Sequence, residues 1–104
     1  PGDRRGSLAR AALGQASVSG AAAVIAIGAV YARTTVKYGE RGRRYVHMEA
    51  GHAAQNLLLQ ATALGLAAVP VGAFSDRRVR AALDLAAEVE PLYLLPVGHS
   101  RDDG

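Results

Sequence analysis

Residues 45–74, YVHMEAGHAAQNLLLQATALGLAAVPVGAF, decide the fold of this chain. Up to residue 66 the stretch contains no proline, and its apolar residues recur at helical spacing, which predicts one long helix over residues 45–66. Gly65 is placed to end that helix. The following AAVPVGAF, residues 67–74, predicts a strand that Pro70 confines to a sheet edge, a bulge or a strand end.

Small residues mark the first half of the predicted long helix, at Ala50, Gly51, Ala53 and Ala54. Such residues let another helix pack at a short interaxial distance. Aromatic residues make up only 5% of the chain, and most of its apolar content is Ala, Leu and Val. Because small side chains bury little area, the core depends on a partner surface. We expect an oligomer, and a homodimer is the simplest one.

The flanking segments alternate between helical and extended patterns. Residues 22–30, AAVIAIGAV, predict a strand buried on both faces, and residues 91–97, PLYLLPV, predict a last buried strand. Ser7 and Ser75 are candidate N-caps, the second for a helix over residues 76–85. Between them, residues 31–44 predict a short helical piece and a basic, glycine-hinged loop. This order indicates an α+β domain.

Length and composition bound the function. A chain of 104 residues is one domain or a piece of one. The net charge of +3 rests on 12 basic against 9 acidic residues, a weak basis for binding nucleic acid, and we expect none. Cysteine is absent, which excludes disulfides and thiolate chemistry and suits the reducing cytoplasm. The two long uncharged stretches are too polar to span a membrane, so we expect no membrane partner.

The candidate chemical groups do not form a catalytic or metal site. Glu49 and His52 make one Glu-x-x-His pair beside His47, whereas a carboxylate-bridged dimetal site needs a second pair and further glutamates. Neither G-x-S-x-G nor a phosphate-binding glycine motif occurs. Tyr38 and Tyr45 flank a basic stretch that could contact phosphates, but acidic residues dilute its charge. We therefore assign no catalytic residue and no metal ligand.

Four segments in combination resemble the nitroreductase superfamily: YGERGRRY at 38–45, EAGHAAQNLLL at 49–59, ALGL at 63–66 and VPVGAF at 69–74. Within that superfamily the chain is most similar to the SagB-type dehydrogenase branch, which includes the azoline oxidases of ribosomal peptide maturation. The likeness runs from about Leu8 to Arg101. It implies an α+β FMN-binding fold with a mixed sheet, which dimerises through long central helices and holds FMN at the subunit interface.

The resemblance also implies flavin-binding residues. Pro70, Val71, Gly72 and Ala73 match the family segment that passes the isoalloxazine ring, where a backbone N–H near Gly72 or Ala73 would donate to flavin N5. Arg101 lies where the family places late phosphate-contacting basic residues. The family's arginine-rich first segment has no counterpart here. With Pro1 in place of an initiator methionine, we expect residues 1–104 to be the C-terminal half of a nitroreductase-like domain.

Two functions remain open on the sequence. The resemblance implies a fragment of an FMN-dependent oxidoreductase, active when joined to the other half of its domain. NADH, NADPH or oxygen would be its redox partner, and a peptide or a small molecule its substrate. The alternative is a non-catalytic scaffold or interaction protein that keeps the dimer helix and no longer binds flavin.

Overall fold

The computed structural model describes residues 3–14 and 20–99. Its elements follow one another in the order α1 (Arg5–Ala11), β1 (Ala23–Ala29), α3 (Ala32–Tyr38), α4 (Arg41–Ala63), β2 (Ala67–Ala68), α5 (Asp76–Leu83) and β3 (Glu90–Gly98). The predicted α+β class is therefore confirmed. The predicted order of helices and strands is also confirmed, although several boundaries differ.

The three strands form a sheet in the order β1-β3-β2. β1 pairs antiparallel with β3 from Ala23↔Val97 to Ala29↔Glu90, and the register shifts between Ile27 and Gly28. β2 pairs antiparallel with the far end of β3. Because β3 runs back between two strands of the opposite direction, both pairings in the described residues are antiparallel. The mixed sheet expected from the sequence is thus corrected to an antiparallel one for this part of the chain.

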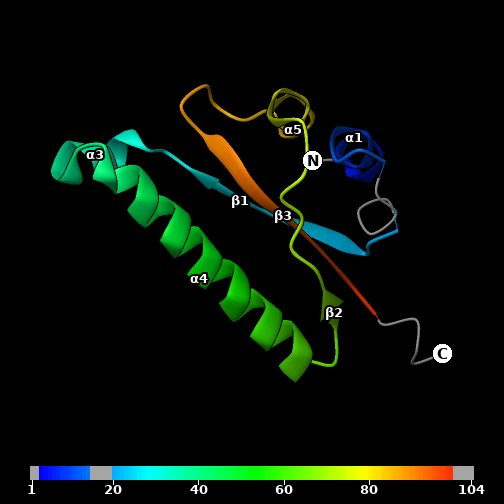
Figure 1. The fold of residues 1–104 in the computed structure, drawn as a ribbon. Helices are drawn as coiled ribbons and strands as arrows, with labels where there is room; N and C mark the ends of the chain where they lie inside the picture. Colours follow the sequence, from blue (N-terminus) through cyan, green and yellow to red (C-terminus); the bar gives the residue numbers. More distant parts are fainter. Residues whose placement is uncertain (1–2, 15–19, 100–104) are drawn as a thin grey trace.

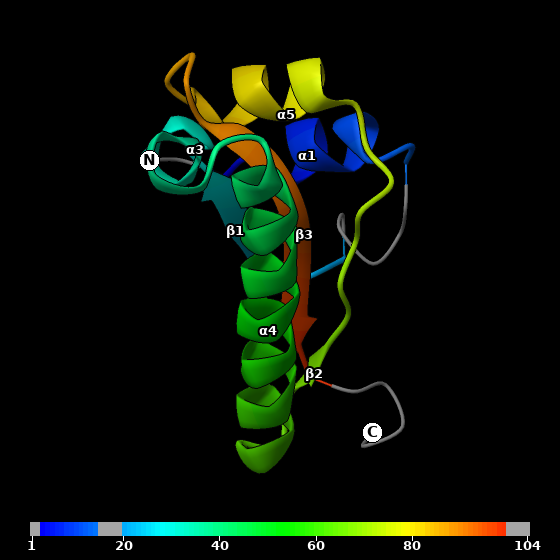
Figure 2. The same ribbon diagram turned by 60° about the vertical axis from the view of Figure 1, so that its left-hand side comes forward.

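Helices cover both faces of the sheet. α4 crosses one face, and α1 and α5 lie together on the other (Figures 1 and 2). Leu94 and Leu95 are neighbours on β3, so their side chains point to opposite faces, and both are fully buried. Leu94 packs in the cluster formed with α1 and α5. Leu95 faces α4, whose own buried residues are Gly42, Ala50, Ala54 and Ala61.

The long helix begins earlier than the sequence predicts. α4 starts at Arg41, so the basic stretch is helical rather than a loop. Gly39 has φ +64, which turns the chain sharply between α3 and α4. A Cβ on Gly42 would lie 3.1 Å from backbone atoms of Thr34 and Thr35, so this glycine lets α3 approach α4 closely. The helix ends at Ala63, three residues before the predicted end, and Gly65 follows it with φ +75 as the sequence predicts.

β1 is much more exposed than predicted. Each of its residues is exposed or half-buried, and Ile25 is 43% exposed. The prediction of a strand buried on both faces is wrong because β1 is an edge strand and α4 covers it only in part. The radius of gyration, 14.6 Å, exceeds the roughly 13 Å of a compact domain of this length. The chain is therefore less compact than a typical domain of its length, and β1 keeps part of its apolar surface exposed.

The structure confirms one of the two predicted serine N-caps and not the other. The Ser75 side chain accepts a hydrogen bond from the Arg78 backbone N–H at 3.3 Å, which confirms it as the N-cap of α5. Ser7 is not a cap, because α1 begins at Arg5 with Arg4 at the N-cap position. The Arg4 guanidinium donates to the carbonyl of Ala82 at 2.7 Å and so ties the start of α1 to α5.

Candidate functional site

The segment Pro70–Ala73 runs along the edge of β3 that lies opposite β1. The Val69 N–H donates to Pro96 O at 3.4 Å, and Val71 both donates to and accepts from Leu94, at 2.7 and 2.9 Å. Pairing therefore continues on both sides of Pro70, because the backbone of this intervening residue faces away from β3. The sequence correctly places Pro70 at a sheet edge, but the proline does not interrupt the pairing.

Gly72 offers an open backbone donor. It takes part in no hydrogen bond with the described residues, and it is exposed. A Cβ on Gly72 would meet only the Tyr93 ring, at an ordinary 3.9 Å, and its φ is not in the left-handed region. The fold itself therefore does not require glycine here. Ala73, by contrast, already interacts within the chain, which favours Gly72 as the free donor.

The other predicted flavin contacts divide into three groups. Pro70 and Ala73 are exposed along the same edge as Gly72 and are brought together by the structure. Val71 is only 5% exposed, and its side chain packs in the core with Leu94, so it anchors the segment from within. Arg101 lies outside the described residues. The structure thus gathers three backbone positions at one sheet edge, with Val71 holding them in place.

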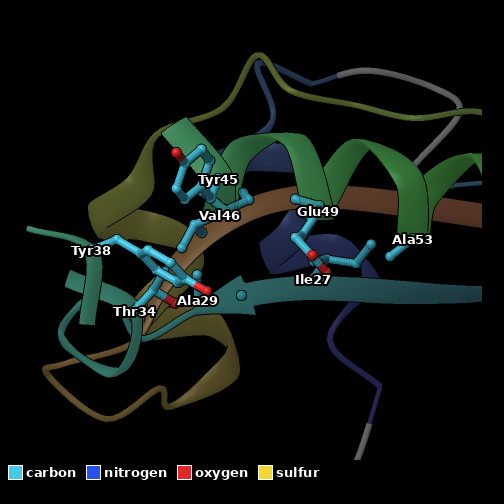
Figure 3. A pocket seen from close by; sticks show the side chains of 11 residues that line it. Ile27, Ala29, Thr34, Tyr38, Tyr45, Val46, Glu49 and Ala53 are labelled. Carbon is cyan, nitrogen blue, oxygen red and sulfur yellow. The ribbon is translucent and has the colours of Figure 1, made fainter. Parts of the chain in front are cut away.

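A groove of about 740 Å³ lies at the β1 edge of the sheet, where α3 and α4 meet β1 (Figure 3). Ile27 and Ala29 of β1 line it together with Thr34 and Tyr38 of α3 and with Tyr45 and Glu49 of α4. The two tyrosine rings are perpendicular, with centroids 5.2 Å apart. The sequence analysis did not find this groove. The sequence does contain a sign of it: Thr34 and Tyr38 are four residues apart, as are Tyr45 and Glu49, so the two members of each pair share one helix face.

His47 has a hydrogen-bond partner within the chain. Its Nε2 lies 2.7 Å from the Tyr31 hydroxyl, and the Arg43 guanidinium lies 4.7 Å from the centre of the Tyr31 ring. Partial burial raises the pKa of Tyr31, and the negative charge of Glu90 raises it further, while Arg43 acts in the opposite direction. The part of the chain that the structure describes holds no group of three or more potential metal ligands.

Comparison with known proteins gives the family. Residues 3–99 match the model of the Nitroreductase family, which covers nearly all of the chain and both helical layers. The chain belongs to the nitroreductase family, a family of oxidoreductases. Over 91 residues it is 54% identical to a Methanocaldococcus jannaschii protein named as a putative nitroreductase, a match that covers 88% of this chain.

Solved structures share the fold. A protein from Anabaena variabilis described as a putative nitroreductase superposes with a TM-score of 0.89 at 34% identity, over 96% of this chain and 20% of that one. The NADPH:FMN oxidoreductase from Vibrio harveyi superposes with a TM-score of 0.79 at 27% identity, over 94% of this chain and 46% of that one. The chain spans about half the length of the curated relative that it matches. No helix among the described residues is long and apolar enough to cross a membrane.

Proposed function

We propose that this chain forms the C-terminal half of an FMN-dependent oxidoreductase domain of the SagB-type dehydrogenase branch, with the flavin against Pro70–Ala73. The observation that carries the proposal is the backbone N–H of Gly72, which is exposed at the edge of β3 and has no partner among the described residues. Membership of the nitroreductase family supports the flavin as its ligand. FMN, when bound, supplies the hydride-transfer chemistry.

The contribution of this chain is to hold a donor in a fixed place. The two hydrogen bonds between Val71 and Leu94, together with burial of the Val71 side chain, fix the backbone next to Gly72. A donor fixed in advance stabilises charge that develops on a ligand atom, because the protein need not reorganise. Gly72 would serve flavin N5 in this way. Pro70 and Ala73 would contact the ring system on either side of it.

We expect groups outside the described residues to hold the phosphate end of FMN. In the proposed complete domain, guanidinium groups from the other half, together with Arg101, contact the phosphate. Losing two such charge-assisted contacts weakens binding by roughly two to four orders of magnitude. We therefore expect the 104-residue chain by itself to bind FMN weakly. The nicotinamide donor belongs to the same proposal, and the Vibrio harveyi relative, described as an NADPH:FMN oxidoreductase complexed with NAD+, supports it.

A homodimer through α4 is part of the proposal, with a changed contact surface. Ala50 and Ala54 are buried against the chain's own sheet, and Ala53 lines the groove beside β1. The four small residues predicted as one contact surface therefore do not all face a partner chain. Gly51 remains open, and Met48 and Leu59 expose 51% and 60% of their surface on the same helix. Exposed large apolar side chains of this kind support association with another chain.

A chimera tests the function directly. The region of the Methanocaldococcus jannaschii relative that this chain does not match is fused to residues 1–104, since 54% identity in the matched region preserves much of the interface. The purified chimera is expected to be yellow, with the absorption bands of bound flavin, and to consume NADH or NADPH. A folded chimera that remains colourless after incubation with FMN would instead favour the scaffold alternative.

A further inference from the structure

α1 and α5 lie side by side on the sheet face opposite α4 (Figures 1 and 2), and hydrogen bonds join them at both ends. The Arg4 guanidinium donates to the carbonyl of Ala82 at 2.7 Å, and the Ser75 N–H donates to the carbonyl of Ala11 at 2.7 Å. The start of each helix is thus bonded to the end of the other. Val79 of α5 is fully buried in the core cluster that includes both helices. The surface that the two helices form together is therefore fixed before any ligand binds.

A groove of about 360 Å³ lies between these two helices, and three arginines line it. Arg4 and Arg10 come from the side of α1, with Ser7 between them, and Arg78 comes from α5. Residues three apart on a helix lie on one face, so this spacing brings the three α1 residues to the same side. Two alanines of α5 complete the lining, and their small side chains leave the groove open. Packing of α1 on α5 therefore gathers three guanidinium groups from segments that are distant in the sequence.

Two of the three guanidinium groups have no acidic partner. Arg10 and Arg78 form no ion pair with the described residues, and the partner of Arg10 is the neutral Ser7 hydroxyl, at 3.4 Å. Arg80, on the same helix α5, is by contrast paired with Glu90 at 2.6 Å. None of the described residues that line the groove is acidic. Because like charges repel one another, an anion in the groove would stabilise the two helices together.

The donors in the groove are those that recognise a phosphate group. A guanidinium is planar and can donate two parallel N–H groups to two oxygens of one phosphate, in charge-assisted bonds stronger than neutral ones. A phosphomonoester carries up to two negative charges near neutral pH, because its second pKa is about 6. The bond from Arg4 to the Ala82 carbonyl orients that guanidinium, and a neutral carbonyl does not cancel its charge. A donor oriented in advance loses less freedom when the ligand binds.

We propose that the groove between α1 and α5 binds a phosphate group, either as inorganic phosphate or as the end of a small phosphomonoester. Arg10 and Arg78 contact the phosphate oxygens from opposite helices. Arg4 adds a third guanidinium, and the Ser7 hydroxyl donates to one of the oxygens. The site does not depend on whether FMN binds, because it lies between two helices, whereas the proposed flavin contact at Pro70–Ala73 lies along the edge of β3.

Inorganic phosphate and glycerol 3-phosphate are the probes, each titrated into the 104-residue chain at constant ionic strength and followed by amide NMR shifts. Both are expected to give saturable, millimolar binding with the largest shifts in α1 and α5. Tighter binding of the ester would assign the site to phosphomonoesters, and tighter binding of inorganic phosphate would assign it to the free ion. Acetate, which has one charge and two oxygens, should bind at least about fivefold more weakly than either.

Single substitutions locate the binding. Arg10→Gln and Arg78→Gln should each weaken phosphate binding by about three- to fivefold, the effect of one exposed charge pair. Arg77→Gln is the matched control, because it removes an exposed arginine of α5 that does not line the groove. At constant ionic strength it should change the affinity by less than about twofold.

Three results would overturn the proposal. The first is the absence of saturable binding, or saturable shifts that lie outside α1 and α5. The second is an equal loss of affinity in Arg77→Gln and Arg78→Gln, which would show attraction to the net charge alone. The third is acetate binding as tightly as phosphate. Circular dichroism of each variant separates a local effect from unfolding, and Arg10→Gln provides a second test if Arg78→Gln fails to fold.

Discussion

Replacing Gly51 by leucine tests the stability of one chain and the association of two chains independently. A Cβ on Gly51 meets no atom within 4 Å in its own chain, so the larger side chain has space. Leucine also favours helix over glycine, which should stabilise α4 by about 0.5–1 kcal/mol. The isolated subunit is therefore expected to unfold at an equal or higher urea concentration than the unaltered chain.

Association should respond in the opposite direction. If α4 packs against a second copy near Gly51, overpacking by leucine costs about 1–3 kcal/mol, which raises the dimer dissociation constant by roughly five- to hundredfold. Sedimentation equilibrium over a range of micromolar concentrations measures this constant. Ala81→Leu, at an exposed position on α5, is the matched control and should not change it. A monomeric unaltered chain, or a Gly51→Leu variant that associates as tightly as the unaltered chain, would refute the reasoning.

Three further changes test separate parts of the account. In the chimera, Gly72→Pro removes the backbone N–H and should slow flavin reduction by roughly a hundredfold while weakening FMN binding much less, because one fixed donor contributes about 2.7–4 kcal/mol; an unchanged stopped-flow rate would remove Gly72 from the mechanism. Folding raises the pKa of Tyr31, so its stabilising contribution is complete below pH about 10 and is lost as the pH rises through the folded pKa. Tyr31→Phe should therefore reduce the alkaline loss of stability in urea titrations, and an identical pH profile would contradict this. Ser75→Ala removes the N-cap of α5 and should lower the free energy of unfolding by about 1 kcal/mol in urea, whereas an unchanged value would mean that water replaces the cap.

Local rules predicted the parts of the fold that local interactions decide. Gly65 ends α4 with the positive φ that favours glycine, and Ser75 caps α5 with its own side chain. Both effects act within a few residues, so a sequence pattern contains the necessary information. The segment Pro70–Ala73 was likewise found as a sheet edge, because proline restricts a strand to such positions.

The remaining features depend on contacts between distant segments. Ser7 looks like a cap, but Arg4 precedes the helix and bonds to Ala82, 78 positions away in the sequence. The apolar pattern of β1 indicates burial, but the strand lies at the edge of the sheet. Its own residues do not determine which distant segment covers it. The groove at Glu49 exists only because α3 packs closely on α4 at Gly42. A pattern within either helix alone does not specify that arrangement.

FMN affinity, measured by fluorescence quenching for the 104-residue chain and for the chimera side by side, tests the central claim most directly. The account predicts that the chimera binds FMN roughly two to four orders of magnitude more tightly than the isolated chain, because each part carries only some of the contacts. Sub-micromolar binding by the isolated chain would contradict the claim that it is half of a flavin site. Equally weak binding by a folded chimera would contradict the claim that the other half completes it.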